Sequence, residues 1–339
     1  MSEKIIEVQE LTEITAKKLI AAGFRPADAN TVADVLVYAD KRGVHSHGVM
    51  RVEHYCTRLA KGGLNPVPHI TIEEKTPVIS IVDSDDGMGH VACKIATKHG
   101  ISVAKKFGMA MVVVKRTSHC GALAYYAEMA AREDIISIGM TQTDKCVVPF
   151  GGAEPFFGTN PIAFSFPSDA DNPVVGDMAT SNVAFGKILY SKEKNLPIPN
   201  DWAVDKDGNP ITDPNEFSAL LPFGGAKGYC IGLAIDALTG VLMNAQFGPH
   251  IHQMYGEYDK MRDLVSTFIF INPEFFGGTT SYKKLMKQMS DELHQSKPRK
   301  GNKQVLLPGE PEFINAKESE SKGVRIPESV YEYLISDMI

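Results

Sequence analysis

The sequence has few cysteines and no cysteine pairs at close spacing. It contains five, an odd number, and none shows the C-x-x-C spacing of a redox or zinc motif. This usage indicates reduced thiols in a cytoplasmic protein rather than a disulfide framework. His45, His47, His54 and His119 include only an H-x-H pair, which without a helical i, i+4 pair does not predict a metal site.

Basic tracts and long apolar runs are also missing. Lys and Arg number 35 against 41 Asp and Glu, a net charge of -6, and no basic stretch predicts binding to nucleic acid. The N-terminal residues lead into an amphipathic pattern with no apolar signal-peptide core, and we expect no apolar run to reach membrane-spanning length. The sequence therefore predicts a cytoplasmic protein without nucleic-acid or membrane partners.

Apolar residues, by contrast, are plentiful and regularly spaced. They make up 43% of 339 residues, which favours two packed domains or one large lobed domain. Helical spacing predicts helices over residues 7–22, 26–42, 91–107, 122–132, 182–194, 229–243, 282–294 and 328–335. Strand patterns cover 69–74, 77–83, 109–115, 135–140, 162–166, 173–176 and 266–271. Their alternation indicates an α/β protein, in which 229–243 is a buried helix and 298–311 a polar linker.

Residues 42–51 concentrate groups that carry protons and bind anions. Two imidazoles and the Ser46 hydroxyl lie between the guanidiniums of Arg42 and Arg51. A neutral imidazole accepts a proton near pH 7, and an arginine fork matches a carboxylate. This combination suits an enzyme that removes a proton from a small acid.

A helix starting near Ser46 would carry this motif on one of two faces. Apolar residues would form one stripe, namely Val49, Val52, Cys56 and Leu59. Polar residues would lie opposite, namely His47, Arg51, His54, Tyr55 and Arg58. From the pattern alone, the polar face is either wetted surface or one wall of a site.

Two further segments invite a ligand. Gly87, Gly89 and Ala92 follow a strand with G-x-G-x-x-A spacing, although the second strand ends in a basic pair instead of the acidic residue that binds a ribose. His119 follows the strand over 109–115, where ligands of α/β sheets gather. On position alone, His119 is a catalytic base or a helix-capping neighbour, and the glycine-rich turn before Lys227 is a phosphate cradle or a simple turn.

Longer motifs extend along the whole chain. They are VADVLVYADKRGVHSHGVMRVEHY (32–55), VVPFGGAE (147–154), GTNPIAF (158–164), GDMATS (176–181), WAVDKDGNPITDP (202–214), LLPFGGAKGY (220–229) and YEYLISD (331–337). With these motifs the chain resembles the malate/L-lactate dehydrogenase-like family of NAD(P)-dependent oxidoreductases. Their combination is most similar to the branch that oxidises (S)-ureidoglycolate to oxalurate.

The resemblance implies a fold and a domain division. It implies a non-Rossmann α/β fold with a mixed, largely antiparallel sheet in residues 69–298, and a mainly helical domain from residues 1–68 and 299–339. Gly87 and Gly89 are then turn residues. A homodimer is implied, in which both chains help to build each site.

The resemblance also implies residue roles. His119 is the expected base and His47 the alternative. Arg51 is the expected carboxylate clamp, Ser46 a substrate or nicotinamide contact, and Tyr55 and Arg42 further substrate contacts. Contacts to NAD, or to NADP, are implied for Thr143, Asp177, Met178, Ala179, Lys227, Pro308, Gly309 and Glu310.

Other functions stay open at this point. One is the oxidation or reduction of another small acid, such as malate, lactate, a sugar keto acid or a cyclic imino acid. Another is metal-dependent hydrolysis at the histidine cluster. A third is binding of a small acid without catalysis.

Overall fold

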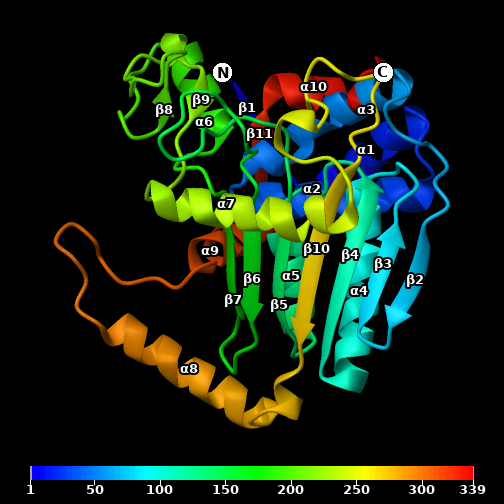
Figure 1. Cartoon of the computed structure of the whole chain (residues 1–339), viewed down its shortest axis with the longest axis vertical. Coiled ribbons are helices and arrows are strands. Elements are labelled where there is room, and N and C mark those ends of the chain that lie inside the picture. The colour runs from blue at the N-terminus through cyan, green and yellow to red at the C-terminus, as the bar shows by residue number, and fades with distance from the viewer. Residues whose placement is uncertain (1, 339) are drawn as a thin grey trace.

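A seven-stranded sheet forms the centre of the computed structural model, which describes residues 2–338 (Figure 1). Its strands are β2 (Thr71–Thr76), β3 (Ile79–Asp83), β4 (Met109–Thr117), β10 (Leu264–Ile271), β5 (Ile136–Thr141), β6 (Ile162–Phe166) and β7 (Val174–Met178), in that order across the sheet. Only β3 and β4 pair in parallel. The predicted α/β fold with a largely antiparallel sheet is therefore confirmed.

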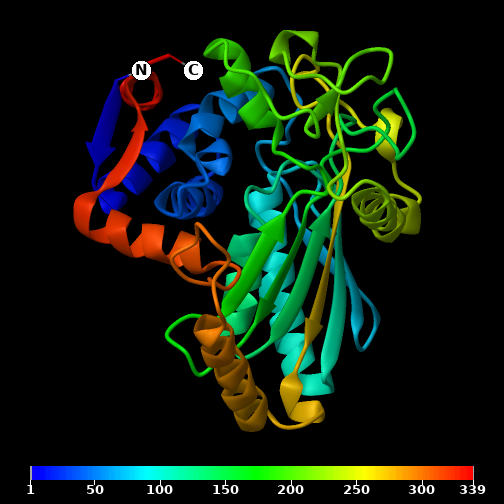
Figure 2. The same cartoon turned by 90° about the vertical axis from the view of Figure 1, so that its left-hand side faces the viewer.

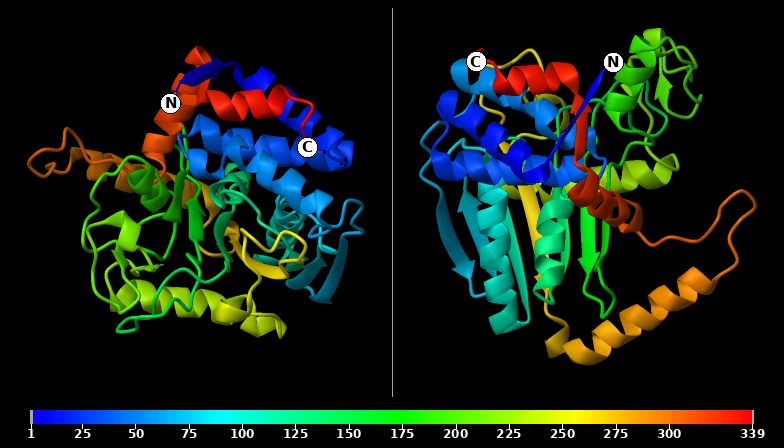
Figure 3. Two further views of the ribbon diagram at one scale, coloured as in Figure 1. Left: turned by 90° about the horizontal axis from the view of Figure 1, so that it is seen from above. Right: turned by 180° about the vertical axis from the view of Figure 1, so that it is seen from behind.

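Helices cover the two faces of this sheet unequally. Both α4 (Gly89–Phe107) and α5 (Ala124–Arg132) pack on one face, as the view from behind shows (Figure 3). Strand alternation turns fully buried residues such as Val112 and Phe268 toward these helices. On the opposite face α7 (Ala226–Leu238) crosses only the upper part of the sheet (Figure 2).

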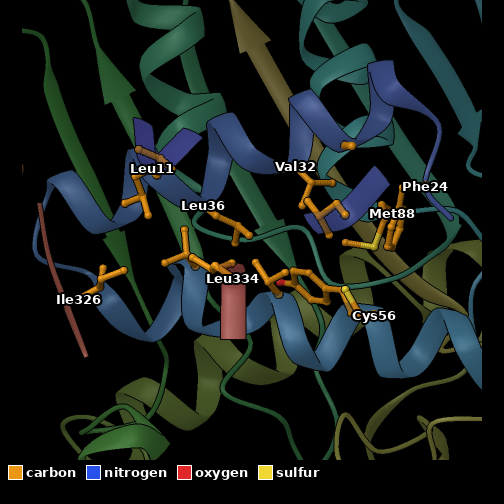
Figure 4. Packing of buried hydrophobic residues seen from close by; sticks show 14 of the residues in the cluster. Leu11, Phe24, Val32, Leu36, Cys56, Met88, Ile326 and Leu334 are labelled. Carbon is orange, nitrogen blue, oxygen red and sulfur yellow. The ribbon is translucent and has the colours of Figure 1, made fainter. Parts of the chain in front are cut away.

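A second, mainly helical layer lies above one end of the sheet. It contains α1 (Val8–Ala21), α2 (Pro26–Lys41), α3 (Val52–Ala60) and α10 (Glu328–Ile335). Its core joins residues from both ends of the chain, including Leu11, Leu36 and Leu334, as Figure 4 shows. The predicted bounds of α1 and α2 agree with the structure within one residue, and Gly23 and Gly43 end them with positive φ.

Four short strands and helix α9 escaped sequence prediction. The terminal strands β1 (Glu3–Ile6) and β11 (Val324–Pro327) pair antiparallel, and two-residue strands β8 (Ala203–Val204) and β9 (Ala219–Leu220) pair within the proline-rich loop. The helices α6 (Phe185–Glu193) and α8 (Thr279–Gln295) were predicted. The linker expected over 298–311 is wrong at its end, because α9 (Glu310–Lys322) begins there.

The helix predicted to start near Ser46 starts later. Two 3-10 turns, His45–His47 and Val49–Arg51, precede α3. Val49, Val52 and Cys56 are buried as expected. The polar face is not a wetted surface, because Tyr55 and Arg58 are both 0% exposed.

The apolar helix predicted over 229–243 is not buried. Helix α7 ends at Leu238. The side chain of Leu233 on this helix is half exposed, and so is the 3-10 turn Val241–Met243 that follows it. By length and composition Ala226–Met243 also meets the requirement for a membrane span, with 33% of it buried. The expectation that no run reaches this length is therefore wrong.

Candidate active site

The turn that carries Ser46 and His47 is fixed from below by Asp40 at the end of α2. The Asp40 carboxylate accepts hydrogen bonds from the Val49 amide (2.7 Å) and from His45 Nδ1 (2.8 Å). Any side chain on Gly48 would overlap this carboxylate. The hydrogen bond to Asp40 raises the pKa of His45, and burial raises the pKa of Asp40. The sequence motif thus becomes a rigid turn that presents His47 inward.

Two histidines from distant parts of the chain face each other. The rings of His47 and His119 are stacked with centroids 5.6 Å apart. His119 follows β4, and His90 from the first turn of α4 lies 6.0 Å from it, centroid to centroid. The structure therefore brings together the two predicted histidines and adds a third.

Burial keeps these imidazoles neutral. Desolvation, together with the positive charge of Arg51, lowers the pKa of His47 to about 4. Desolvation lowers the pKa of His119 well below its ordinary value, and the neighbouring His47 and Arg51 act in the same direction. Both rings are therefore proton acceptors at neutral pH.

Tyr55 holds the His119 ring from its inner side. The Tyr55 hydroxyl lies 2.7 Å from His119 Nδ1, and the Gly121 amide lies 3.3 Å from the same nitrogen. If Nδ1 carries the ring proton and donates it to Tyr55, Nε2 keeps a free lone pair for a substrate. The Tyr55 contact allows either direction, whereas the Gly121 amide can only donate, so its contact is made in the other tautomer, in which Nδ1 is the acceptor. Tyr55 is fully buried and reaches His119 from α3.

Arg51 lies at the edge of the histidine pair. Its Nε donates to the Ser46 carbonyl oxygen (2.6 Å), and its Nη1 donates to the Tyr255 hydroxyl. The Ser46 hydroxyl lies 3.0 Å from His47 Nδ1. These hydrogen bonds hold the outer edge of the guanidinium, formed by Nη1 and Nη2, in place beside the histidines.

Arg42 and His45 lie outside this cluster. The Arg42 guanidinium forms an ion pair with Glu128 (2.7 Å) and stacks 3.5 Å from the Tyr38 ring centroid, which ties α2 to α5. His45 is largely exposed, with 49% of its side chain accessible. Of the residues in 42–51, the structure brings Ser46, His47 and Arg51 to the site.

The segments expected to contact the cofactor meet along β7. The Val175 amide donates to the Pro308 carbonyl oxygen (3.3 Å), and a side chain on Gly309 would overlap the Val175 carbonyl. Further along the strand, Asp177 accepts a hydrogen bond from the Ala124 amide (2.8 Å) at the start of α5. Pro308 and Gly309 therefore lie against Val175, two residues before Asp177 on the same strand.

Thr180 links this strand to the remaining two positions. Its amide donates to the Thr159 carbonyl (2.8 Å), and the Thr159 hydroxyl lies 3.4 Å from the Thr143 hydroxyl. The Thr180 carbonyl accepts from the Phe223 amide (3.0 Å), just before Lys227 in the first turn of α7. Among residues 2–338, no side chain caps the amides at this helix start, so the amides and the lysine together suit a phosphate. The residues present thus fit a dinucleotide.

The G-x-G-x-x-A turn has a different role. Side chains on Gly87 or Gly89 would overlap Pro68 and the Ser118 carbonyl, respectively, so the glycines allow close packing. Arg116 of the basic pair is bound to Asp83 (2.8 Å) and is not free for a ribose phosphate. The Rossmann interpretation is not supported, because both features serve local packing.

Several residues of the site gave no sequence signal. His90 is fully buried, and neither ring nitrogen has a partner among residues 2–338. An ion pair joins Asp144, next to Thr143, to the buried Arg262. Arg58 was assigned only to a polar helix face. These partners lie far apart in the sequence, so local spacing does not reveal them.

A cavity of about 530 Å³ lies between residues 148–153 and Gly224-Gly225, beside the start of α7 and away from the histidines. Within residues 2–338, no group of three or more His, Cys, Asp or Glu residues is arranged to hold a metal ion.

Comparison with known proteins decides the family. The model of the malate/L-lactate dehydrogenase family matches residues 6–335. The chain belongs to this family. Ureidoglycolate dehydrogenase (NAD(+)) of Escherichia coli (strain K12) is 42% identical over 334 residues, which cover 98% of this chain and 96% of the relative. L-sulfolactate dehydrogenase of Methanocaldococcus jannaschii is 39% identical over 92% of this chain and 90% of the relative.

Solved structures agree with this assignment. Malate dehydrogenase from Entamoeba histolytica superposes with a TM-score of 0.92 at 30% identity, over 98% of this chain and 96% of that chain. Sulfolactate dehydrogenase from Methanocaldococcus jannaschii gives 0.91 at 37% identity, over 98% and 95%. This member of the malate/L-lactate dehydrogenase family is therefore an oxidoreductase, and its fold is that of the family.

Proposed function

We propose that the protein catalyses the NAD-dependent oxidation of (S)-ureidoglycolate to oxalurate. The observation that carries the proposal is the neutral His119, oriented by Tyr55 (2.7 Å) and facing His47. The relatives named for ureidoglycolate dehydrogenase support the substrate and the choice of NAD over NADP.

The mechanism assigns one task to each residue. Arg51 binds the substrate carboxylate with the outer edge of its guanidinium, and Ser46 and His47 contact the same acid. His119 Nε2 accepts the proton of the substrate hydroxyl. General-base catalysis of this kind raises the reaction rate about 10²- to 10⁴-fold. NAD, when bound, would supply the acceptor for the hydride that leaves the hydroxyl-bearing carbon. The products are the oxo acid, reduced cofactor and one proton on His119.

The cofactor would lie along β7. Thr143, Lys227, residues 177–179 and residues 308–310 would hold it, with the phosphates near Lys227 and the helix start. Tyr55, which is fully buried, would act through His119 and not by touching the substrate.

We also propose a domain division, with a helical domain from residues 1–68 and 299–339 and a cofactor domain from 69–298. The core that joins α1, α2 and α10 supports it. The five free thiols support a cytoplasmic location.

A homodimer would cover apolar surface that this chain leaves open. Ser165 donates a hydrogen bond to the Ala127 carbonyl of α5, so strand alternation turns Phe164 and Phe166 to the opposite face of the sheet, and both are partly exposed. Leu242 after α7 is 49% exposed, and Leu285 on α8 is 64% exposed. Figure 1 shows α8 projecting away from the sheet. Exposed apolar side chains that gather in patches are typical of subunit contacts.

The proposed function is tested with a panel of acids. Reduced-nicotinamide absorbance is followed with (S)-ureidoglycolate, malate, lactate and sulfolactate, each with NAD and with NADP. We expect the highest kcat/KM for (S)-ureidoglycolate with NAD. A higher value with malate or sulfolactate would assign a sister activity.

Two other results would reject dehydrogenase activity altogether. Turnover without nicotinamide that a chelator abolishes would indicate a metal-dependent hydrolase. Binding of acids without any reduction of nicotinamide would indicate a binding protein.

A further inference from the structure

One buried arginine holds a loop segment over the polar face of α3. Arg58 donates from Nη1 to the carbonyl oxygens of Glu257 (3.0 Å) and Lys260 (2.6 Å). Its Nη2 donates to those of Gln253 (3.1 Å) and Met254 (2.8 Å). A single guanidinium thus fixes both ends of residues 253–260, which we name the cover segment.

The cover segment packs closely on α3 and its exit. A side chain on Gly63 would overlap the carbonyl oxygen of Tyr258, so a glycine is needed there. The Tyr258 ring packs 5.3 Å from the His54 ring, centroid to centroid. Backbone contact at Gly63 and ring contact at His54 show a built interface rather than a loose loop.

The cover segment is also tied to the cofactor side of the site. The Met254 amide donates to Asp144 Oδ2 (3.2 Å), and the buried Arg262 binds the other oxygen of this carboxylate. Asp144 directly follows Thr143, the expected cofactor contact. The segment therefore spans both halves of the site.

The cover segment places Tyr255 next to Arg51. Its hydroxyl oxygen accepts from Arg51 Nη1, while Arg51 Nε is occupied by the Ser46 carbonyl. Arg51 Nη2 has no hydrogen-bond partner among residues 2–338. Because the Tyr255 oxygen accepts from the arginine, its own proton is free to be donated. The Tyr255 side chain is accessible, since the residue is 46% exposed.

We propose that Tyr255 is a substrate-binding residue that completes the carboxylate site, and that Arg58 positions it. A carboxylate forked on Arg51 Nη1 and Nη2 brings one oxygen beside the Tyr255 hydroxyl, which donates a third hydrogen bond to it. The inference rests on the proposed role of Arg51 as the carboxylate clamp. Arg58 contributes only by holding the cover segment.

The test measures binding of oxamate, a small carboxylate with an amide, to the full-length protein with NADH by titration calorimetry. Tyr255→Phe keeps the ring and loses the hydroxyl, so we expect the Kd of oxamate to rise about 10-fold, the usual loss for a hydrogen bond to a charged group. The Kd of NADH should not change. Tyr258→Phe is the matched control, because Tyr258 contacts His54 through its ring and its hydroxyl has no hydrogen-bond partner among residues 2–338.

Arg58→Lys tests the positioning role. It retains the charge but cannot reach four carbonyls. We expect weaker oxamate binding, and a double variant with Tyr255→Phe no weaker than the weaker single variant, because both changes remove one contact. If Arg58→Lys does not fold, Tyr255→Phe still decides the role of Tyr255.

Two results overturn the inference. A Tyr255→Phe protein that binds oxamate as well as Tyr258→Phe removes Tyr255 from the carboxylate site. Fully additive effects of Arg58→Lys and Tyr255→Phe remove the positioning role of Arg58. Failure of the proposed function is seen separately, as absence of nicotinamide reduction by the unmodified protein with every acid of the panel, while oxamate binding still reports on Tyr255.

Discussion

The two faces of α3 are both buried, but against different partners. Val52 and Cys56 pack in the apolar core formed by the two ends of the chain. Arg58 on the opposite face and Tyr55, whose ring joins the same core, are equally buried, and their polar groups bind partners from elsewhere, the cover segment and His119, respectively. The apolar face stabilises the fold, whereas the polar face arranges hydrogen bonds around a site. Burial alone therefore does not distinguish structural residues from functional ones, and the partner of each polar group does.

The largest effect expected on the polar side concerns Arg51. Arg51→Lys keeps the charge but loses the fork, and it also loses the contacts to Ser46 and Tyr255. We expect KM for the acid to rise about 10- to 100-fold, as for loss of charge-assisted hydrogen bonds, with KM for NAD unchanged. Steady-state kinetics measure both constants. Unchanged affinity for the acid would remove Arg51 from the clamp.

The opposite face should show the reverse behaviour. Val52 is 0% exposed in the core, so Val52→Ala should lower the free energy of unfolding by about 2 kcal/mol through lost burial and a small cavity. Urea denaturation measures this change. At a temperature where the variant is folded, kcat and KM should stay at the values of the unmodified protein. A large fall in kcat without loss of stability would mean that the two faces are not separable.

The smallest effect expected is that of mildly acidic pH. Burial lowers the pKa values of His47 and His119, so both rings stay neutral below the ordinary histidine pKa of about 6.5. A protonated ring cannot accept the substrate proton, so activity is lost as pH falls through the lowered pKa. We expect kcat/KM to change less than about twofold between pH 8 and 6. An acid limb centred near neutral pH would show that the base is solvated.

Sequence patterns predicted most elements with an apolar stripe, but they missed β11, whose buried Val324 and Ile326 alternate over only four residues. Helix α9 has only Ala316 buried, so its charged sequence gave no helical periodicity. The 3-10 turns before α3 depend on the buried Asp40 carboxylate, which is a tertiary contact. Helix α7 was predicted as buried, but its apolar side is exposed in the single chain.

The sequence predicted the motif residues of the site, but it did not predict the residues with which they form hydrogen bonds. His47 and Arg51 are in one local motif, and His119 follows a predicted strand. The hydroxyl of Tyr55 meets His119 across 64 residues, and Arg51 meets Tyr255 across 204. Contacts of this separation follow from the fold and not from spacing.

The most direct test of the account compares kcat of His119→Ala with that of His47→Ala, using (S)-ureidoglycolate and NAD at saturating concentrations. We predict that His119→Ala lowers kcat by about 10²- to 10⁴-fold, as for loss of a general base, with little change in KM. His47→Ala should retain most of kcat and mainly raise KM, because His47 contacts the bound acid. The opposite order, with near-normal kcat for His119→Ala and a large loss for His47→Ala, would contradict the account.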